Sequence, residues 1–455
     1  MVHDVFDVLA VAACPCRKPF LTKVANKRGT MHRAVLGLIA AAFSASASSA
    51  QGTIPIGTLL PVAATTSEPL GLILGIKHLS DGRLLVNDAG GRRLVLFDPT
   101  LTRATVVADT TDKAPLNYGP NPTPLIPYLG DSSLFLDRRA LAFQLLDGQG
   151  RAVRTMALPK ASDTPLIWGG RVLADGAGRL VYRGLPHITP VKDTGQALMV
   201  THPADSAPIV RADFDKRSVD TLGIVKLPLL YESRRARRTD GTFATTIALF
   251  GLSWIDDWVM TSDGAIAIVR GQDYHIDWVM PDGRRISTPR MQIDWRRIDD
   301  AEKRHLADSA ANEVQTFFNE RRAQQQAAGN AADKLRIVAR ADIATGTMQV
   351  IPYDATITAP LDRIPDYQPP VRAGAVKADR DGNVWILPAT SAQATTGALV
   401  YDVVNRNGQV TQRVAMPAGR SIVDFGPGGI VYLMFKDGAG AWHLERTKLA
   451  AGERR

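Results

Sequence analysis

The chain has 455 residues, of which 22% are charged and 45% hydrophobic, and this balance excludes both a disordered chain and a protein that lies mainly within a membrane. Only 6% of the residues are aromatic, so stacking platforms for single-stranded nucleic acid would be sparse. The 38 glycines and 28 prolines are many for a helical protein and typical of a chain built from turns.

Residues 31–50 are predicted to be a secretory signal peptide. A short basic start is followed by an apolar run over residues 34–43, and small residues follow, with Ser48 and Ala50 three and one positions before the expected cleavage. We therefore expect export to the periplasm or the extracellular space, with a mature chain that begins at Gln51.

Residues 1–30 are interpreted as an over-extended start. A lipoprotein box at residues 11–14 is an alternative, although Asp4 and Asp7 give the segment before it the wrong charge. Both cysteines lie within residues 1–50, so the mature domain, residues 51–455, must be stable without disulfides. Its 48 Lys and Arg against 43 Asp and Glu give too small an excess to indicate a nucleic-acid partner.

One structural unit is repeated along most of the mature chain. Each copy contains short alternating strands joined by Gly turns such as Asp381-Gly382 and Asn407-Gly408, which is typical of paired β-hairpins. The predicted copies span residues 74–108, 126–158, 171–227, 258–291, 376–416 and 421–449. Four-stranded antiparallel repeats predict an all-β chain, a six-bladed β-propeller.

The last copy contains three strands, while the extended segment 52–63 has no hairpin partner nearby. We expect this N-terminal strand to pair with residues 442–449 and to close the ring, because closure leaves no exposed sheet edge. Between blades 4 and 5 lies an insertion, residues 295–370, predicted to contain an amphipathic helix over 299–326 and a hairpin over 335–353. The helix either caps the ring or serves as a lid or partner-binding element.

Three short segments of the chain resemble those of a known family. Residues 146–151, 280–284 and 381–385 repeat an Asp-Gly hairpin with similar flanks, and the chain resembles the six-bladed TolB-like and NHL-type propellers of bacterial exported proteins. The resemblance implies the fold. Some relatives are metal-dependent lactonases or lyases whose acidic, Asn or His ligands surround the central channel, but no such ligand set can be matched here residue by residue.

The long connections predict the position of a binding site. Residues 109–124, 184–208, 229–253 and 294–370 should emerge on the face opposite the Asp-Gly turns, and loops gathered on one face of a rigid scaffold often bind ligands. The predicted ligand-binding residues are Arg270, Asp273, Tyr274, Asp366 and Tyr367. They would suit a peptide or a sugar, whereas the alternative is that the prolines around Asp366 only turn the chain and both tyrosines pack beneath the insertion helix.

Other patterns allow a structural and a functional interpretation. Asp88, His187 and His202 fall near the same predicted rim and could hold a divalent metal, although the sequence contains no short-spaced His or Cys motif and no evident cofactor motif. The basic run 234–238 is either exposed loop charge or an anion-binding site. The Ile-Asp-Trp phrases at 254–258, 275–278 and 292–295 are best explained as strands with a core face and a polar face.

The sequence therefore predicts an exported, monomeric recognition module that binds a peptide, glycan or protein partner on its long-loop face, without nucleic acid and without a transmembrane segment in the mature chain. No nucleophile elbow, phosphate-binding loop or zinc-protease motif is present, so enzyme activity stays open. The alternative is a metal-dependent lactonase, hydrolase or lyase at the channel mouth. Convergence of three or more residues of one set would favour it: Asp88, His187, His202, Asp273, Tyr274, Asp366 and Asn383.

Overall fold

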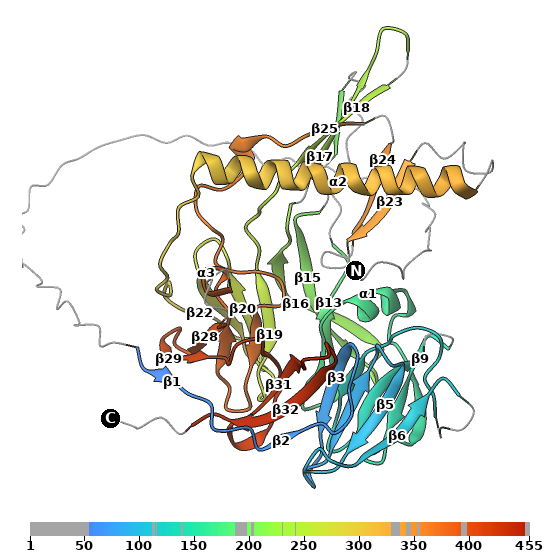
Figure 1. The fold of residues 1–455 in the computed structure, drawn as a ribbon, viewed down its shortest axis with the longest axis vertical. Helices are drawn as coiled ribbons and strands as arrows, with labels where there is room; N and C mark the ends of the chain where they lie inside the picture. The colour runs from blue at the N-terminus through green and yellow to red at the C-terminus, as the bar shows by residue number, and fades with distance from the viewer. Residues whose placement is uncertain are drawn as a thin grey trace, which may run out of the picture. The chain divides into compact units, whose positions relative to one another are not determined.

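The computed structural model describes residues 54–111, 114, 116–137, 140–186, 198–201, 204–229, 231–241, 243–328, 337–342, 347–352, 355–392 and 398–450. These residues form an all-β protein with several four-stranded antiparallel sheets and few helices (Figure 1). No helix among them is long and apolar enough to cross a bilayer.

Six sheets follow one another along the chain, and we number them in that order. Sheet 1 contains β3 (Ile73–His78), β4 (Leu84–Asp88), β5 (Arg93–Phe97), β6 (Ala104–Asp109) and β7 (Leu116–Asn117). Sheet 2 contains β8 (Leu125–Pro127), β9 (Ser133–Asp137), β10 (Ala142–Leu146) and β11 (Ala152–Ala157). Sheet 3 contains β12 (Val172–Ala174), β13 (Leu180–Arg183), β15 (Ser206–Asp213) and β16 (Ser218–Lys226).

Sheet 4 contains β19 (Asp257–Met260), β20 (Ile266–Arg270), β21 (His275–Val279) and β22 (Arg285–Ser287). Sheet 5 contains β26 (Val376–Ala378), β27 (Val384–Ile386), β28 (Val400–Val404), β29 (Val410–Ala415) and β1 (Ile56–Gly57). Sheet 6 contains β30 (Ser421–Phe425), β31 (Ile430–Lys436), β32 (Trp442–Lys448) and β2 (Ala64–Thr65). Short helices lie outside the sheets: α1 (Thr164–Gly169), α3 (Ala389–Ala392) and the 3₁₀ turns Ala161–Asp163, Leu361–Arg363 and Pro427–Gly429.

Consecutive sheets pack against one another through apolar faces. Sheets 4 and 5 share a core that includes Trp278, Tyr274 and Ile386, each at most 1% exposed. The first strands also meet: β3 contacts β8, β8 contacts β12, β19 contacts β26, and β3 contacts β30 of the last sheet. Repetition of antiparallel four-stranded sheets that pack in this order is the plan of a β-propeller.

Tight turns between the first two strands of a sheet need a residue with positive φ. Gly82 and Gly382, both with φ of 85°, occupy this position in sheets 1 and 5. A side chain rarely adopts this conformation, so the glycines of the repeated Asp-Gly turns set where each hairpin reverses.

The N-terminal segment completes the last sheet. The amides of Leu60 and Ala63 donate to the carbonyls of Lys448 and Arg446, both at 2.8 Å, and β2 continues this antiparallel pairing along β32. The predicted pairing is therefore present but extends beyond residue 63. The start of the segment differs from the prediction, because β1 pairs in parallel with β29 of sheet 5.

The long connections contain a further sheet, which we call the accessory sheet. It contains β14 (Leu198–Thr201), β17 (Tyr231–Arg237), β18 (Phe243–Leu249) and β25 (Thr356–Thr358). Residues 229–253 are a long connection as expected, and they contain the hairpin β17–β18, which was not predicted from the sequence. Arg234 and Arg235 are thus exposed side chains on a strand, and Arg234 pairs with the buried Glu232.

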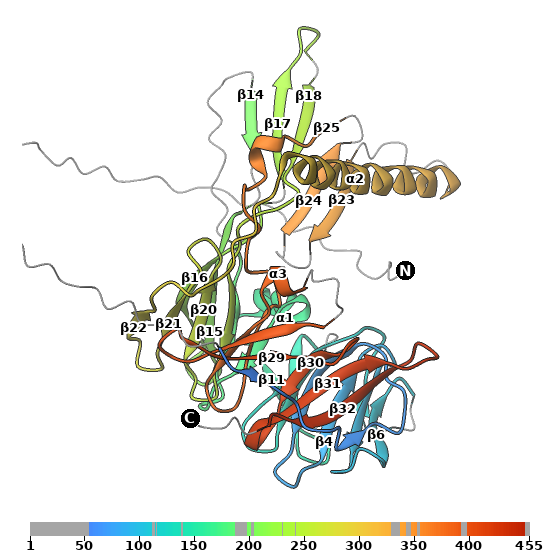
Figure 2. The same ribbon diagram turned by 60° about the vertical axis from the view of Figure 1, so that its left-hand side comes forward.

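Helix α2 (Asp300–Ala328) packs beside this sheet, against β18 and β25 (Figure 2). Its Val314 joins Ile247 and Leu249 of β18 in a small apolar cluster. The predicted helix over 299–326 and the predicted hairpin are confirmed, the hairpin as β23 (Ile337–Asp342) and β24 (Thr347–Pro352).

Deleting residues 52–63 should destabilise the protein. The deletion removes backbone hydrogen bonds to β32 and the bond from Arg413 N to Pro55 O (2.8 Å), and it uncovers the edge of the last sheet. At about 1 kcal/mol for each of several bonds, we expect the free energy of unfolding in urea to fall by roughly 2–5 kcal/mol. The control is Ile56→Ala, a 75% exposed side chain, which should change little. An unchanged free energy in the deletion would refute the structural role of this segment.

Candidate functional site

A short two-stranded ribbon connects sheet 4 and α2 with the chain that enters sheet 5. The amide of Ile298 donates to the carbonyl of Asp366, and the amide of Gln368 donates to the carbonyl of Arg296, both at 2.9 Å. Arg297 and Tyr367 lie opposite each other in this antiparallel pairing. The ribbon therefore has two faces with alternating side chains.

One face of the ribbon is buried and the other is exposed. Ile298 and Gln368 are 2% and 5% exposed, whereas Trp295 and Tyr367 are 43% and 45% exposed. Trp295, Arg297 and Tyr367 share the outward face, which we call the aromatic ribbon face. Among the exposed large apolar side chains of the described residues, Trp295 and Tyr367 are the aromatic ones.

Several contacts hold this face in position. Trp254 packs edge-on against Trp295 with ring centroids 6.0 Å apart. On the buried side, the Arg296 guanidinium donates to both Glu302 carboxylate oxygens at 2.7 Å and to Gln368 Oε1 at 3.0 Å. The hydrogen bond from Arg296 lowers the pKa of Glu302. The first turn of α2 thus anchors the ribbon through a bidentate ion pair.

A small cavity of about 190 Å³ follows directly along the chain. Phe250 and Ile255 line one side, Gln368 and Pro369 continue from the ribbon, and Arg372 supplies a charged group. The cavity is thus mainly apolar with one cation, and Gln368, which lines it, belongs to the buried face of the ribbon.

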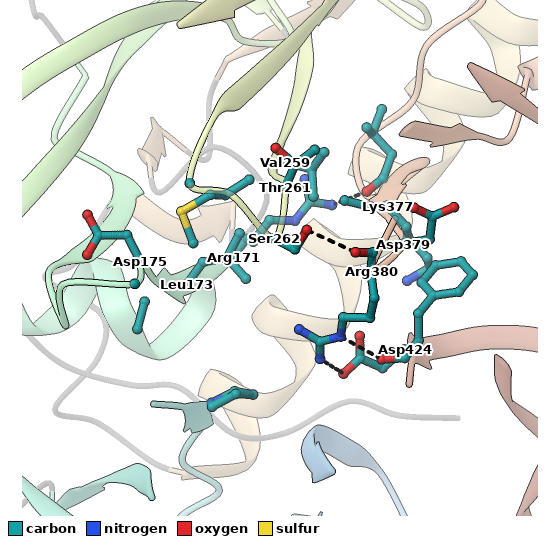
Figure 3. A pocket seen from close by; sticks show the side chains of 18 of the residues that line it. Arg171, Leu173, Asp175, Val259, Thr261, Ser262, Lys377, Asp379, Arg380 and Asp424 are labelled. Atoms are coloured by element: carbon teal, nitrogen blue, oxygen red, sulfur yellow. Dashed lines mark hydrogen bonds and ion pairs between the residues drawn. The ribbon is translucent and has the colours of Figure 1, made fainter. Parts of the chain in front are cut away.

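A second cavity, of about 260 Å³, lies between first strands of the sheets, and we call it the central cavity (Figure 3). It is lined by residues of β12, β19, β26 and β30, with Pro127 of β8. Its wall combines apolar and polar groups in about equal share. The polar side chains around it include Arg171, Asp175, Thr261, Lys377, Arg380 and Asp424.

One ion pair joins three sheets at this second cavity. Arg171, just before β12, donates to Asp257 Oδ1 at 3.1 Å and to the carbonyl of Val376 at 2.9 Å. The other oxygen of Asp257 accepts the amide of Val376 at 2.9 Å. Asp257 is 7% exposed, and both of its carboxylate oxygens accept hydrogen bonds.

The predicted residues of the fourth blade have structural partners. Arg270 donates to Asp277 and Asp256, each at 2.7 Å, and Tyr274 is 1% exposed in the core between sheets 4 and 5. Asp273 forms an exposed ion pair with Arg290 at 2.6 Å. The structure thus places Tyr274 in the packing, because its ring fills the space between two sheets.

Asp366 and Tyr367, the predicted site residues that precede sheet 5, have exposed side chains. Tyr367 belongs to the aromatic ribbon face, and the Asp366 side chain is 72% exposed and pairs with Lys303 of α2. Within the described residues, no hydrogen bond or ion pair joins Asp366 or Tyr367 to the group of Arg270, Asp273 and Tyr274. The two halves of the predicted site are therefore not linked directly.

The predicted metal residues are only partly described. Asp88 is 1% exposed and accepts Arg93 Nε at 2.8 Å and the amide of Gly71 at 2.8 Å, so its charge is used within sheet 1. His187 and His202 lie outside the described residues. In the described ranges, no group of three His, Cys, Asp or Glu side chains could hold a metal ion. None of the described members of the set proposed to converge (Asp88, Asp273, Tyr274, Asp366 and Asn383) lines the central cavity.

Sequence analysis did not single out Trp295, Arg297 or Lys377 as site residues. The three Ile-Asp-Trp segments are similar in sequence and were all interpreted as strands with a core face. This interpretation holds for the buried Trp258 and Trp278 but not for the exposed Trp295. A signal was present nonetheless: Trp295 is followed by Arg296 and Arg297 and lies outside the predicted strands of the fourth unit.

The sequence matches no family model and no curated protein. Solved structures to which the chain is similar include a streptogramin B lyase, at 11% identity and a TM-score of 0.32, covering 85% of this chain and 96% of that chain. A PQQ-bound aldose sugar dehydrogenase from Streptomyces coelicolor has 12% identity and a TM-score of 0.36, covering 88% and 100%. Regucalcin, a calcium-binding protein from Agrobacterium tumefaciens, has 12% identity and a TM-score of 0.30, covering 87% and 97%. Likenesses at this level carry no argument about what this chain binds or does.

The contribution of Glu302 to stability should depend on pH. Its folded-state pKa lies below the ordinary value of 4.5, so its stabilising effect is present above pH 4.5 and is lost as the pH falls through the lower folded-state value. We expect Glu302→Gln to lower Tm at pH 7 and to have a diminishing effect below pH 4.5. The control is Glu320→Gln, at an exposed position further along α2. A Tm difference that stays constant from pH 7 to pH 3 would contradict the ion pair.

Proposed function

We propose that the six sheets form a closed, six-bladed propeller of the TolB-like or NHL type. The contacts between successive first strands support this arrangement, as does the contact of β3 with β30. The pairing of the N-terminal segment with β32 supports closure, because it supplies the fourth strand of the last sheet. The signal-like residues 31–50 support export to the periplasm or the extracellular space.

The function that the geometry supports best is recognition of a protein partner through an extended peptide segment. One observation carries this proposal: Trp295, Arg297 and Tyr367 share the exposed face of a ribbon whose other face is anchored. Trp, Tyr and Arg are the residues most often responsible for affinity at protein interfaces. Because the ribbon is already held by Ile298, Gln368 and Glu302, binding would cost little ordering entropy.

The cavity of about 190 Å³ is lined by Gln368 of the buried face and by none of the three residues of the aromatic ribbon face, so it is not included in the proposed peptide site. A metal-dependent lactonase, hydrolase or lyase at the channel mouth stays a prediction, since His187 and His202 lie outside the described residues.

Peptide selection on the mature protein tests this function. A displayed peptide library would be panned on the natural chain and depleted on the double variant Trp295→Ala/Tyr367→Ala, and enriched peptides would be titrated by calorimetry. We expect each single substitution to weaken binding at least tenfold, because truncation of a central aromatic contact costs about 2 kcal/mol. Tm should stay within a few degrees, since both rings are nearly half exposed.

The control for the peptide titration is Ile286→Ala, an apolar side chain on β22 that is 45% exposed. Peptides that bind the double variant as tightly as the natural chain would refute the site. Failure to enrich any peptide, together with binding of a glycan that is lost in the double variant, would keep the site and reassign its ligand.

A further inference from the structure

The repeated turns allow equivalent positions in different sheets to be compared. In sheet 1 the amide of Leu79 donates to the carbonyl of Arg83 at 2.9 Å, and in sheet 5 the amide of Asp379 donates to the carbonyl of Asn383 at 3.1 Å. A lysine lies two residues before each of these turns. These lysines, Lys77 on β3 and Lys377 on β26, therefore occupy the same place in their sheets.

Lys77 is satisfied by the protein itself. Its ammonium donates to the carbonyl of Tyr128 at 2.9 Å and to the carbonyl of Gly130, both in the turn of the neighbouring sheet. The carboxylate of Asp131 in the same turn adds a favourable charge. A buried cation needs such partners, because water has been removed from it.

Lys377 lacks the equivalent partners. On the neighbouring sheet 6, the carbonyl of Phe425 accepts Arg380 Nε at 3.0 Å instead. Among the described residues, Lys377 has no hydrogen-bond or ion-pair partner, although it lines the central cavity (Figure 3). Burial lowers the pKa of Lys377, and the nearby Arg171 guanidinium lowers it further.

The other cations at the cavity are already paired. Arg171 is bound by Asp257 at 3.1 Å, and Arg380 lies 3.8 Å from Asp424. The ammonium of Lys377 is thus the cation at this cavity that remains for a ligand, within the described residues. The carboxylates of Asp424 and Asp257 act favourably on this ammonium, but neither accepts a hydrogen bond from it. A carboxylate ligand placed beside Lys377 would supply the hydrogen-bond acceptors that the described residues do not supply.

We propose that the central cavity binds a small hydroxycarboxylate through Lys377. The volume of about 260 Å³ lies near the lower end of ligand pockets, roughly 300 Å³, and so suits a molecule of few atoms. Asp379 and Asp424 also line the cavity, so a ligand with a single negative charge is favoured over phosphate or a dicarboxylate. A hydroxyl group on the ligand would donate to Asp424. This site is separate from the aromatic ribbon face and does not depend on the function proposed for it.

Thermal unfolding with added lactate tests the site on the mature protein. We expect Tm to rise with the logarithm of lactate concentration, as for any ligand that binds the folded state, and phosphate and glycerol to give smaller shifts at equal ionic strength. Lys377→Met should abolish the lactate shift, whereas Lys216→Met, at an exposed lysine in the turn after β15, should retain it. A lactate shift that survives in Lys377→Met, or a larger shift with phosphate, would overturn the proposal.

A second measurement uses the natural chain and so does not depend on the folding of a variant. Lysines would be methylated with formaldehyde and a mild reductant, and the rate at each lysine followed by mass spectrometry. Lactate should slow the modification of Lys377 at least fivefold and leave Lys216 unchanged. An equal rate at Lys377 with and without lactate would overturn the proposal.

Discussion

The structure depends on one constraint: the sheets of the repeated unit are apolar on both faces, so each of them must pack against neighbouring sheets. In sheet 3, Leu180 and Tyr182 pack toward sheet 2, while Val181 and Ile209 pack toward sheet 4. A β-strand alternates its side chains, so adjacent residues of one strand belong to different cores. The apolar area buried in this way is the main source of stability in a chain whose described part has no disulfides.

The same constraint explains where the chain can contain additional elements. First strands and their turns must keep their register, because a shift by one residue would move each side chain from one flanking core to the other. The long connections between the sheets have no such requirement on their register. The chain there adds the accessory sheet, α2 and the ribbon, each of which has its own small set of anchors, such as Val314 against β18 and Arg296 with Glu302. The aromatic ribbon face is exposed because its anchors lie on the opposite side of two strands.

The central cavity shows how equivalent positions of a repeated unit can differ in their chemistry. Two equivalent lysines, Lys77 and Lys377, have the same place in the fold and different surroundings, since the partner carbonyls of the first are present and the corresponding carbonyl near the second is taken by Arg380. The backbone arrangement alone therefore does not define the chemistry of a position on a first strand. That chemistry follows from which side chain binds the carbonyls of the next sheet, and in sheet 5 the nearby Arg380 binds the Phe425 carbonyl in place of Lys377.

The all-β class, the strand order within the repeated units, the helix near residues 299–326 and the hairpin after it could be predicted from the sequence, because each is set by local periodicity and by Gly turns. The hairpin β17–β18 could not, since its arginine-rich strand gains stability from β14, β25 and α2, which are distant in sequence. Of the candidate site, the display of Asp366 and Tyr367 followed from the stiff prolines around them. The burial of Tyr274, the exposure of Trp295 and the lack of a partner for Lys377 were decided by the tertiary structure alone. Exposure and pairing depend on which neighbouring sheet or strand occupies the space beside a side chain, and that information is absent from the local pattern of residues.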